Sequence, residues 1–457
     1  MFTPDDTIVA VATPPGRGAL GVVRLSGPRA ATIAVALLGR SEPLRPRHAT
    51  LARIVDHTAA APTAVDQVVA TAFPHSGSYT GDDVVEISAH GSPVLVDRIV
   101  ALACAAGARL AEPGEFTFRA YLNGRLDLLQ AEAVADLIDA VTPLQARIAF
   151  DQLEGTVSGP IRELDGQLFD LIARLEASLD FPEEGYHFVA AGAVAEAVGA
   201  IRRQVDALLS GAARGTLIRE GCQVVIVGKP NVGKSSLFNR LLGVDRAIVT
   251  PKAGTTRDLV SDVTDLNGLA VTLVDSAGIR SASDVVEAEG VARARQALGV
   301  AAAAVVVVDR SAPVDQEDRA VLEDTAPLPR VVVVNKVDAP AVWAPDSLAL
   351  RAETAVVEVS ARTGEGCDVL RALLCDVLTG GESLRDTPAL ANRRHIGLLE
   401  RGGEALGAAE KTAASGAAEE FVLADLQRAR AALDELTGKR TPDDVLRHIF
   451  DRFCIGK

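Results

Sequence analysis

Apolar residues in the first 120 positions occur in short runs that turn-forming residues separate. Such runs predict strands, here over residues 7–12, 20–25, 68–73 and 84–88. Two longer apolar stretches, at 30–38 and 94–106, predict helices. The pattern therefore predicts an α+β domain over residues 1–120.

From about residue 121 the apolar spacing becomes helical. Leucine and other apolar residues recur every three or four positions, which places them on one face of a helix. This periodicity continues to about residue 217 and returns at 393–412 and 419–436. We therefore predict a helical domain in two parts, 121–217 and 383–457.

The segment between these two parts, residues 218–382, has a different pattern, in which apolar runs alternate with helical segments. The runs predict strands that are buried on both faces, at residues 223–227, 271–274, 303–308, 331–334 and 356–359. Strands that alternate with helices form a mostly parallel sheet. The chain is therefore predicted to be multidomain, α/β and α, with an α/β domain inserted into a helical domain.

The inserted domain carries a phosphate-loop pattern. Residues 228–235 read G-x-x-x-x-G-K-S between a predicted strand and a helix predicted to start near Ser236, which is the context that this motif requires. Backbone N–H groups of such a loop surround phosphate oxygens, its lysine reaches the β- and γ-phosphates, and its hydroxyl binds Mg²⁺. The predicted contacts are Asn231, Val232, Gly233, Lys234, Ser235 and Ser236, with Ser235 as the Mg²⁺ ligand.

Two further segments are predicted to surround the Mg²⁺ ion and the γ-phosphate. The first is Asp275, Ser276, Ala277 and Gly278, which follow an apolar strand. Asp275 can hold the Mg²⁺ shell and the Gly278 N–H can contact the γ-phosphate. The second segment is residues 254–258, G-T-T-R-D, in which Thr256 can offer another hydroxyl to Mg²⁺. Ile279 occupies the place where many GTPases hold a water-orienting glutamine, so either another group orients the attacking water or the chain hydrolyses GTP slowly.

The base that this site binds is predicted from two motifs that follow later strands. In the N-K-x-D motif of Asn335, Lys336 and Asp338, the carboxylate can accept hydrogen bonds from the N1–H and the exocyclic amine of guanine. Adenine offers no such donor pair, which disfavours an ATP-dependent enzyme. After the last strand come Ser360, Ala361 and Arg362, where a backbone N–H can meet guanine O6. Together these features predict a GTP-hydrolysing switch protein.

Composition narrows the setting of this activity. Hydrophobic residues make up 48% and charged residues 23% of the 457 positions, which is a globular balance. The formal net charge of −15 disfavours a broad RNA-binding surface, so RNA would need a local basic patch or a partner protein. The five cysteines form no C-x-x-C pair, and the chain shows no signal peptide and no apolar run of membrane length. A reducing, cytoplasmic setting without a membrane is therefore expected.

Four features together resemble the MnmE (TrmE) family of tRNA-modification GTPases. They are the phosphate loop with Asn231, the G-T-T-R-D segment at 254–258, the D-S-A-G-I-R segment at 275–280 and the ending F-C-I-G-K. The resemblance covers the whole chain, and ordinary GTPases lack the C-I-G-K ending. It implies an N-terminal folate-binding and dimerisation domain, a helical domain and an inserted Ras-like GTPase domain.

The resemblance also implies how the inserted domain hydrolyses GTP. A potassium ion takes the place of an arginine finger and offsets the charge that develops between the phosphates. Its implied ligands are Asn231, Thr250, Lys252 and Thr255, and the implied nucleotide-binding loop is Thr250, Pro251, Lys252, Ala253, Gly254, Thr255 and Thr256. The implied water-orienting residue is Glu287, for which a solvated helix position is the alternative.

For the N-terminal domain, the resemblance implies a site for 5-formyl- or 5,10-methylene-tetrahydrofolate. Its implied contacts are Arg24, Glu86, Arg125 and Lys457. A carboxylate suits the paired donors of a pterin ring and arginines suit the glutamyl carboxylates, although surface ion pairs are the alternative for Arg24, Glu86 and Arg125. Cys454 is either a thiolate that adds to a uracil ring and activates its C5 or a small buried apolar residue.

The implied reaction involves a partner protein. A homodimer of this chain would form a heterotetramer with the flavoprotein MnmG, and the pair would add a carboxymethylaminomethyl or aminomethyl group to C5 of the wobble uridine of certain tRNAs. The rival hypothesis is a stand-alone regulatory GTPase that acts by binding alone, such as a ribosome-assembly factor. Tetrahydrofolate binding by the N-terminal region separates the two hypotheses.

Overall fold

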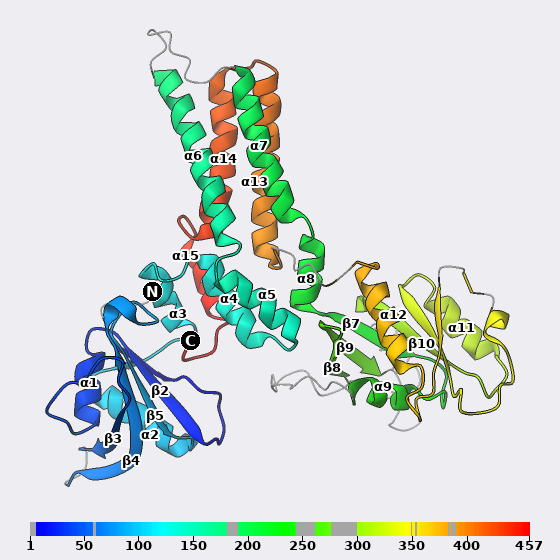
Figure 1. Cartoon of the computed structure of the whole chain (residues 1–457), viewed down its shortest axis with the longest axis horizontal. Coiled ribbons are helices and arrows are strands. Elements are labelled where there is room, and N and C mark those ends of the chain that lie inside the picture. The colour runs from blue at the N-terminus through cyan, green and yellow to red at the C-terminus, as the bar shows by residue number, and fades with distance from the viewer. Residues whose placement is uncertain are drawn as a thin grey trace. The chain divides into compact units, whose positions relative to one another are not determined.

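The structure is a computed structural model that describes residues 6–57, 61–180, 191–243, 261–275, 299–348, 350–351, 354–382, 384 and 390–457. The chain divides into two compact units, both drawn in Figure 1. Unit 1 consists of Met1–Ala135, Gln152–Ile201 and Arg401–Lys457, and unit 2 of Asp136–Asp151 and Arg202–Glu400.

Unit 1 contains a six-stranded sheet in the order β3-β4-β5-β2-β1-β6. Its strands are β1 (Ile8–Val11), β2 (Leu20–Ser26), β3 (Thr50–Asp56), β4 (Thr63–Phe73), β5 (Val84–His90) and β6 (Arg109–Leu110). β1 and β6 are parallel, and the other neighbours are antiparallel. Helices α1 (Ala30–Leu37) and α2 (Pro93–Ala105) pack on the apolar side chains of one face.

The predicted α+β character of this region is confirmed, with three differences in its strands. β4 begins at Thr63 rather than at Val68. β3 and β6 escape the sequence pattern, because Arg53 interrupts the apolar run of β3 and β6 has only 2 residues. Strand pairing with β4 and β1, rather than local propensity, therefore defines these two elements.

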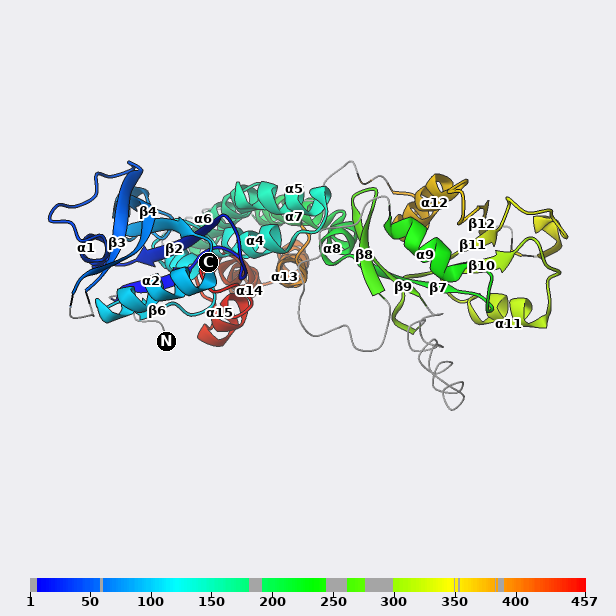
Figure 2. The ribbon, with the colours of Figure 1, turned by 90° about the horizontal axis from the view of Figure 1, so that it is seen from below.

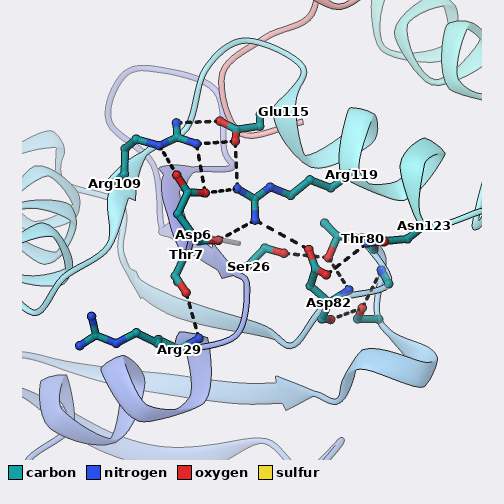
Figure 3. Close-up of polar contacts among 12 residues, drawn as sticks. Asp6, Thr7, Ser26, Arg29, Thr80, Asp82, Arg109, Glu115, Arg119 and Asn123 are labelled. Atoms are coloured by element: carbon teal, nitrogen blue, oxygen red, sulfur yellow. Dashed lines mark hydrogen bonds and ion pairs between the residues drawn. The ribbon is translucent and has the colours of Figure 1, made fainter. Parts of the chain in front are cut away.

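A network of ion pairs fastens the start of β1 to β6 and to α3 (Glu115–Leu122), as Figure 3 shows. Arg109 donates to Asp6 at 2.8 Å and to Glu115 at 2.7 Å. Arg119 donates to the same two carboxylates, at 2.5 Å and 3.0 Å. The Glu115 side chain is fully buried and that of Arg119 is 3% exposed. Each of these charges therefore depends on its partners in place of water.

The helices of unit 1 confirm the predicted helical periodicity. They include α4 (Leu128–Asp139), α6 (Ser158–Asp180), α14 (Glu419–Thr437) and α15 (Asp443–Phe450). α6 and α14 lie side by side (Figure 1), and Leu164, Leu168 and Leu175 of α6 are fully buried. However, α3 begins at Glu115, before residue 121, where the predicted helical domain starts. The sequence pattern does not predict this helix, because the buried Glu115 and Arg119 interrupt its apolar spacing.

Unit 2 contains a second six-stranded sheet, in the order β12-β11-β10-β7-β9-β8. Its strands are β7 (Cys222–Val227), β8 (Ser261–Leu266), β9 (Leu269–Asp275), β10 (Ala303–Asp309), β11 (Arg330–Asn335) and β12 (Ala355–Glu358). β8 is antiparallel to β9, and the other neighbours are parallel. The predicted mostly parallel sheet is therefore confirmed, and β8 is an addition that the sequence pattern did not show.

Helices cover both faces of this second sheet. α9 (Lys234–Leu242) and α12 (Cys367–Thr379) pack on one face, and α11 (Gln316–Asp324) lies on the other (Figure 2). α9 starts at Lys234, two residues before the predicted start near Ser236, because Gly233, with a φ of +101°, turns the chain directly into the helix.

The remaining elements of the described ranges are helices and short 3₁₀ turns. They are α5 (Pro143–Leu153), α7 (Ala191–Leu209), α8 (Ala212–Glu220), α13 (Arg393–Ala414) and the 3₁₀ turns His75–Gly77 and Pro345–Leu348. Across the described ranges, no helix has both the length and the apolar content of a membrane span.

The ion-pair network of Figure 3 predicts a large loss of stability when one member is removed. Arg119→Leu leaves Asp6 and Glu115 with one cationic partner fewer inside unit 1, so we expect the free energy of unfolding to fall by about 3 kcal/mol. Urea titration followed by circular dichroism measures this loss. The control is Arg428→Ala, which removes a surface ion pair with a 67% exposed arginine and should change stability by less than about 0.5 kcal/mol. Equal effects of the two substitutions would contradict the prediction.

Candidate functional site

The carboxyl ends of four parallel strands gather the polar residues of unit 2. β7 runs into the phosphate loop at Gly228, and Ile226 of β7 pairs with Asp275 at the end of β9. On the next two strands, Asp309 pairs with Asn335. Ligands of open parallel sheets bind at this edge, so the fold brings together motifs that are far apart in the sequence.

The phosphate loop has a backbone that only small or flexible residues allow. Gly228 has a φ of +152°, and a Cβ at this position would lie 2.4 Å from the Val307 carbonyl oxygen. Gly233 has a φ of +101° and precedes α9 directly. Ser235 and Ser236 are exposed in the first turn of α9. The loop therefore ends on a helix N-terminus, where free N–H groups favour an anion.

Two lysines of the loop differ in their surroundings. Lys234 is 7% exposed, and its Nζ donates to the Lys229 carbonyl at 2.7 Å. Lys229 instead extends to α11, where its Nζ lies 2.8 Å from Asp315 and 2.6 Å from Asp318. Although burial opposes the charge, these two bonds raise the pKa of Lys229, and the same contact lowers the pKa of Asp315 to about 2.

The contact between Lys229 and α11 was not predicted from the sequence. Asp315 and Asp318 form a capping box, in which each side chain accepts a backbone N–H of the other residue. The D-x-x-D spacing before a helical segment was a signal for the cap. However, only the fold shows that the cap also holds a lysine 86 residues away in the chain.

Asn335 connects the phosphate loop to the loop that is predicted to read the base. Its Nδ2 donates to the Val232 carbonyl at 2.8 Å, and its Oδ1 accepts the Ala361 N–H at 3.0 Å. The side chain is 2% exposed, so both bonds are shielded from water. The predicted nucleotide contacts around residues 232, 335 and 361 are therefore brought together in one place.

Asp338 faces the same loop. Its Oδ1 accepts from the Ser360 hydroxyl at 2.6 Å and its Oδ2 lies 3.0 Å from the Arg362 guanidinium. The Ser360 bond, with the charges of Arg362 and Lys336, lowers the pKa of Asp338, so the group is an ionised acceptor at neutral pH. Lys336 itself is bound to Asp309 at 2.6 Å. This arrangement provides a carboxylate at the end of the sheet for a donor pair such as that of guanine.

Several predicted site residues lie outside the described residues. They are Thr250, Pro251, Lys252, Ala253, Gly254, Thr255 and Thr256, then Ser276, Ala277 and Gly278, and Glu287. Asp275, which directly precedes Ser276, is 3% exposed at the end of β9, and Asn231 in the phosphate loop is exposed with a φ of +64°.

In unit 1, the predicted folate contacts Arg24 and Glu86 form an ion pair on neighbouring strands. Arg24 Nε and Nη2 both lie 2.9 Å from Glu86 Oε1, and Arg24 Nη1 donates to the Gly456 carbonyl at 3.2 Å. Its guanidinium also lies 5.5 Å from the centre of the Tyr79 ring and 5.7 Å from that of Phe116. This pair is no isolated surface contact, because it holds the C-terminal residues against the sheet.

The C-terminal residues are seated by close backbone contacts. Phe116 N–H, in the first turn of α3, donates to the Lys457 main-chain oxygen at 3.2 Å. A Cβ at Gly456 would lie 2.3 Å from the Val11 carbonyl oxygen. Burial, and then the charge of Arg24, lowers the pKa of Lys457, whereas Glu86 acts in the opposite direction. The structure therefore brings Lys457 into the same site as Arg24 and Glu86.

The two other predicted residues of unit 1 are both exposed. Arg125 lies beside the turn at Gly81, and its side chain bonds to none of Arg24, Glu86 and Lys457 among the described residues. Cys454 is a free, exposed thiol, so the alternative of a small buried apolar residue is wrong. A thiol on the surface remains open to a substrate.

The edge of the second sheet defines the class of protein. A phosphate loop on a helix N-terminus, joined through a buried asparagine to a second loop that an ionised carboxylate contacts, is typical of a phosphate-loop domain for guanine nucleotides. A family model described as "MnmE helical domain" matches residues 128–454, and one described as "GTP-binding protein TrmE N-terminus" matches residues 7–125.

Relatives along the whole chain agree with these matches. A protein of Koribacter versatilis (strain Ellin345) named "tRNA modification GTPase MnmE" is 44% identical over 99% of this chain and 99% of its own length. A protein of Chloroflexus aurantiacus with that name is 44% identical over 99% of this chain and 100% of its own length. One from Nitrosomonas europaea is 41% identical over the full length of both. The chain therefore belongs to the MnmE family of GTPases, as the resemblance predicts.

The geometry of Gly233 gives a test of the nucleotide site. A Cβ in Gly233→Ala would lie 2.3 Å from Asn335 Nδ2 and would require alanine at a φ of +101°. We expect the affinity for GDP to fall at least about tenfold, because the strain acts on the loop and on its bond to Asn335. Titration with a fluorescent GDP measures this. The control is Gly397→Ala in α13, where a Cβ meets nothing within 4 Å. A wild-type affinity for GDP in both variants would contradict the proposal that this loop binds the nucleotide.

Proposed function

We propose that this chain hydrolyses GTP to GDP and phosphate in order to drive tRNA modification. With the flavoprotein MnmG, it adds a carboxymethylaminomethyl or aminomethyl group to C5 of the wobble uridine of certain tRNAs, in the cytoplasm. The observation that carries this proposal is the pair of hydrogen bonds from the Asn335 side chain, which join the phosphate loop at Val232 to the loop at Ala361 that is proposed to bind the base. The names of the full-length relatives support the tRNA part.

The residues of the nucleotide site divide by role. The N–H groups at the start of α9, with Lys234, bind the phosphates, and Asp338 with the loop 360–362 binds guanine. Ser235 and Asp275 are oxygen donors at the start of α9 and the end of the neighbouring strand, which fits Mg²⁺. The bound Mg²⁺ would neutralise charge on the β- and γ-phosphates.

Potassium fits the same site. Asn231 is an exposed residue of the phosphate loop, and the side-chain carbonyl oxygen of an asparagine suits a weakly hydrated cation. The other proposed ligands, Thr250, Lys252 and Thr255, and the proposed water-orienting Glu287 lie outside the described residues. In this proposal the cation supplies the positive charge that an arginine finger supplies in other GTPases.

The potassium proposal predicts a strong salt effect on turnover. At equal ionic strength, GTP hydrolysis in KCl should exceed that in NaCl by at least about tenfold, because the larger cation matches the carbonyl ligands. Glu287→Ala should lose most of the activity in KCl yet bind GDP with wild-type affinity. Phosphate release measures the rates, and equal rates in the two salts would exclude the proposed role of potassium in hydrolysis.

The folate site rests on Arg24, Glu86 and Lys457. Both contacts from Arg24 end on Oε1 of Glu86, so Oε2 has no hydrogen bond among the described residues. The Glu86 side chain is 33% exposed, and a carboxylate oxygen in this position suits the paired N–H donors of a pterin ring. A tetrahydrofolate bound there would supply the one-carbon unit, and the exposed Cys454 would add through its thiolate to the uracil ring.

The seated C-terminal residues predict the effect of a small substitution. Gly456→Ala places a methyl group 2.3 Å from the Val11 carbonyl oxygen, so we expect Lys457 to leave the site. The affinity for 5-formyl-tetrahydrofolate should fall at least about tenfold, while GDP affinity stays unchanged. Calorimetric titration of the full chain measures both ligands.

The same titration separates the proposed function from its rival. A wild-type chain that binds GDP but no tetrahydrofolate would favour a stand-alone regulatory GTPase. The homodimer and the heterotetramer with MnmG are part of the proposal, and the mass of the purified complex in solution tests them directly.

A further inference from the structure

An arginine of helix α9 holds the loop that follows the last strand of unit 2. Arg240 Nε donates to the Ala361 carbonyl at 3.3 Å, and its Nη2 donates to the Arg362 carbonyl at 2.5 Å. The same guanidinium faces the turn at Gly364, where a Cβ would lie 3.6 Å from Arg240 Cζ. One planar group therefore spans two successive peptide carbonyls.

The peptide groups at these two carbonyls set the direction of the backbone N–H groups that are proposed to contact guanine. Because the peptide group is planar, fixing the Ala361 carbonyl also fixes the direction of the next N–H, that of Arg362. The N–H of Ala361 is fixed from the other side, by Asn335 Oδ1 at 3.0 Å. The loop is thus restrained both from β11 and from α9.

The restraint extends from the loop to Asp338. The hydroxyl of Ser360 and the guanidinium of Arg362 contact different oxygens of this carboxylate, at 2.6 Å and 3.0 Å. Ser360 is fully buried. A shift of the loop would therefore turn the carboxylate that accepts the guanine donors.

We propose that Arg240 is a positioning residue for guanine recognition, which sets the orientation of Asp338 through the backbone of residues 360–362. This inference rests on the proposed function, in which Asp338 accepts from N1–H and the exocyclic amine of guanine. Since Lys234 and Ser235, the proposed phosphate and Mg²⁺ contacts, also lie in α9, Arg240 connects this helix to the loop that is proposed to read the base.

A second arginine provides a matched control. Arg371 of α12 also spans two main-chain carbonyls, donating to Leu241 at 2.8 Å and to Asp265 at 2.7 Å. It is 7% exposed, so its removal tests the general loss of such a contact. Its acceptors lie in α9 and β8, and neither belongs to the base-reading loop.

The experiment compares GDP with inosine diphosphate, which lacks the exocyclic amine that Asp338 is proposed to bind. Affinities of the full chain are measured by calorimetry for the wild type, Arg240→Ala, Arg240→Lys and Arg371→Ala. A hydrogen bond to a charged group predicts that the wild type prefers GDP by about tenfold or more. We expect Arg240→Ala to reduce this preference at least about threefold, and Arg240→Lys to reduce it less, because one ammonium cannot span both carbonyls.

The outcomes separate positioning from a general structural role. Arg371→Ala should lower the midpoint of thermal unfolding but keep the wild-type preference. An unchanged preference in either Arg240 variant that folds, as judged by circular dichroism, would overturn the inference while leaving the proposed function intact. If the wild type itself binds GDP and inosine diphosphate equally, then Asp338 does not read the amine and the proposed base recognition fails first.

Discussion

The side-chain amide of Asn335 is the interaction on which the nucleotide site depends. It donates to the phosphate loop and accepts from the base loop, in a position that is 2% exposed. An amide offers both a donor and an acceptor in a fixed geometry, so one side chain sets the distance between the phosphate loop and the loop at Ala361. On one side of Asn335, Ser360 bonds to Asp338 and Arg240 bonds to the Ala361 carbonyl, and in the phosphate loop Lys229 bonds to the cap of α11.

In unit 1, too, a single side chain connects two separate segments of the chain. Arg24 bonds to a strand neighbour, Glu86, and to the main chain at Gly456. The Arg24 guanidinium therefore connects strand β5 to the C-terminal segment that contains Cys454 and Lys457. Gly456 is needed for its lack of a side chain, because the Val11 carbonyl occupies the space where a Cβ would lie. A charged pair with this role differs from ordinary surface ion pairs, which contribute little to stability.

The sequence predicts features that are local in the chain. The phosphate loop, the N-K-x-D motif and the apolar strands around them are each encoded within a few residues, and the structure places them at one edge of a sheet. Contacts between distant segments could not be predicted in this way. In the sequence alone, Lys229 is one variable position of the phosphate-loop motif and Arg240 is a charged residue of a helix. The strand β3 is an apolar run that Arg53 interrupts. Their roles follow from partners that only the folded chain supplies.

Competition between GDP and ADP for the purified wild-type chain tests the central claim most directly. A site built to pair a carboxylate with the donors of guanine rejects a base without them. ADP should therefore displace a fluorescent GDP only at concentrations at least about a thousandfold higher than those at which unlabelled GDP does so. Displacement by ADP and GDP at comparable concentrations would contradict the account.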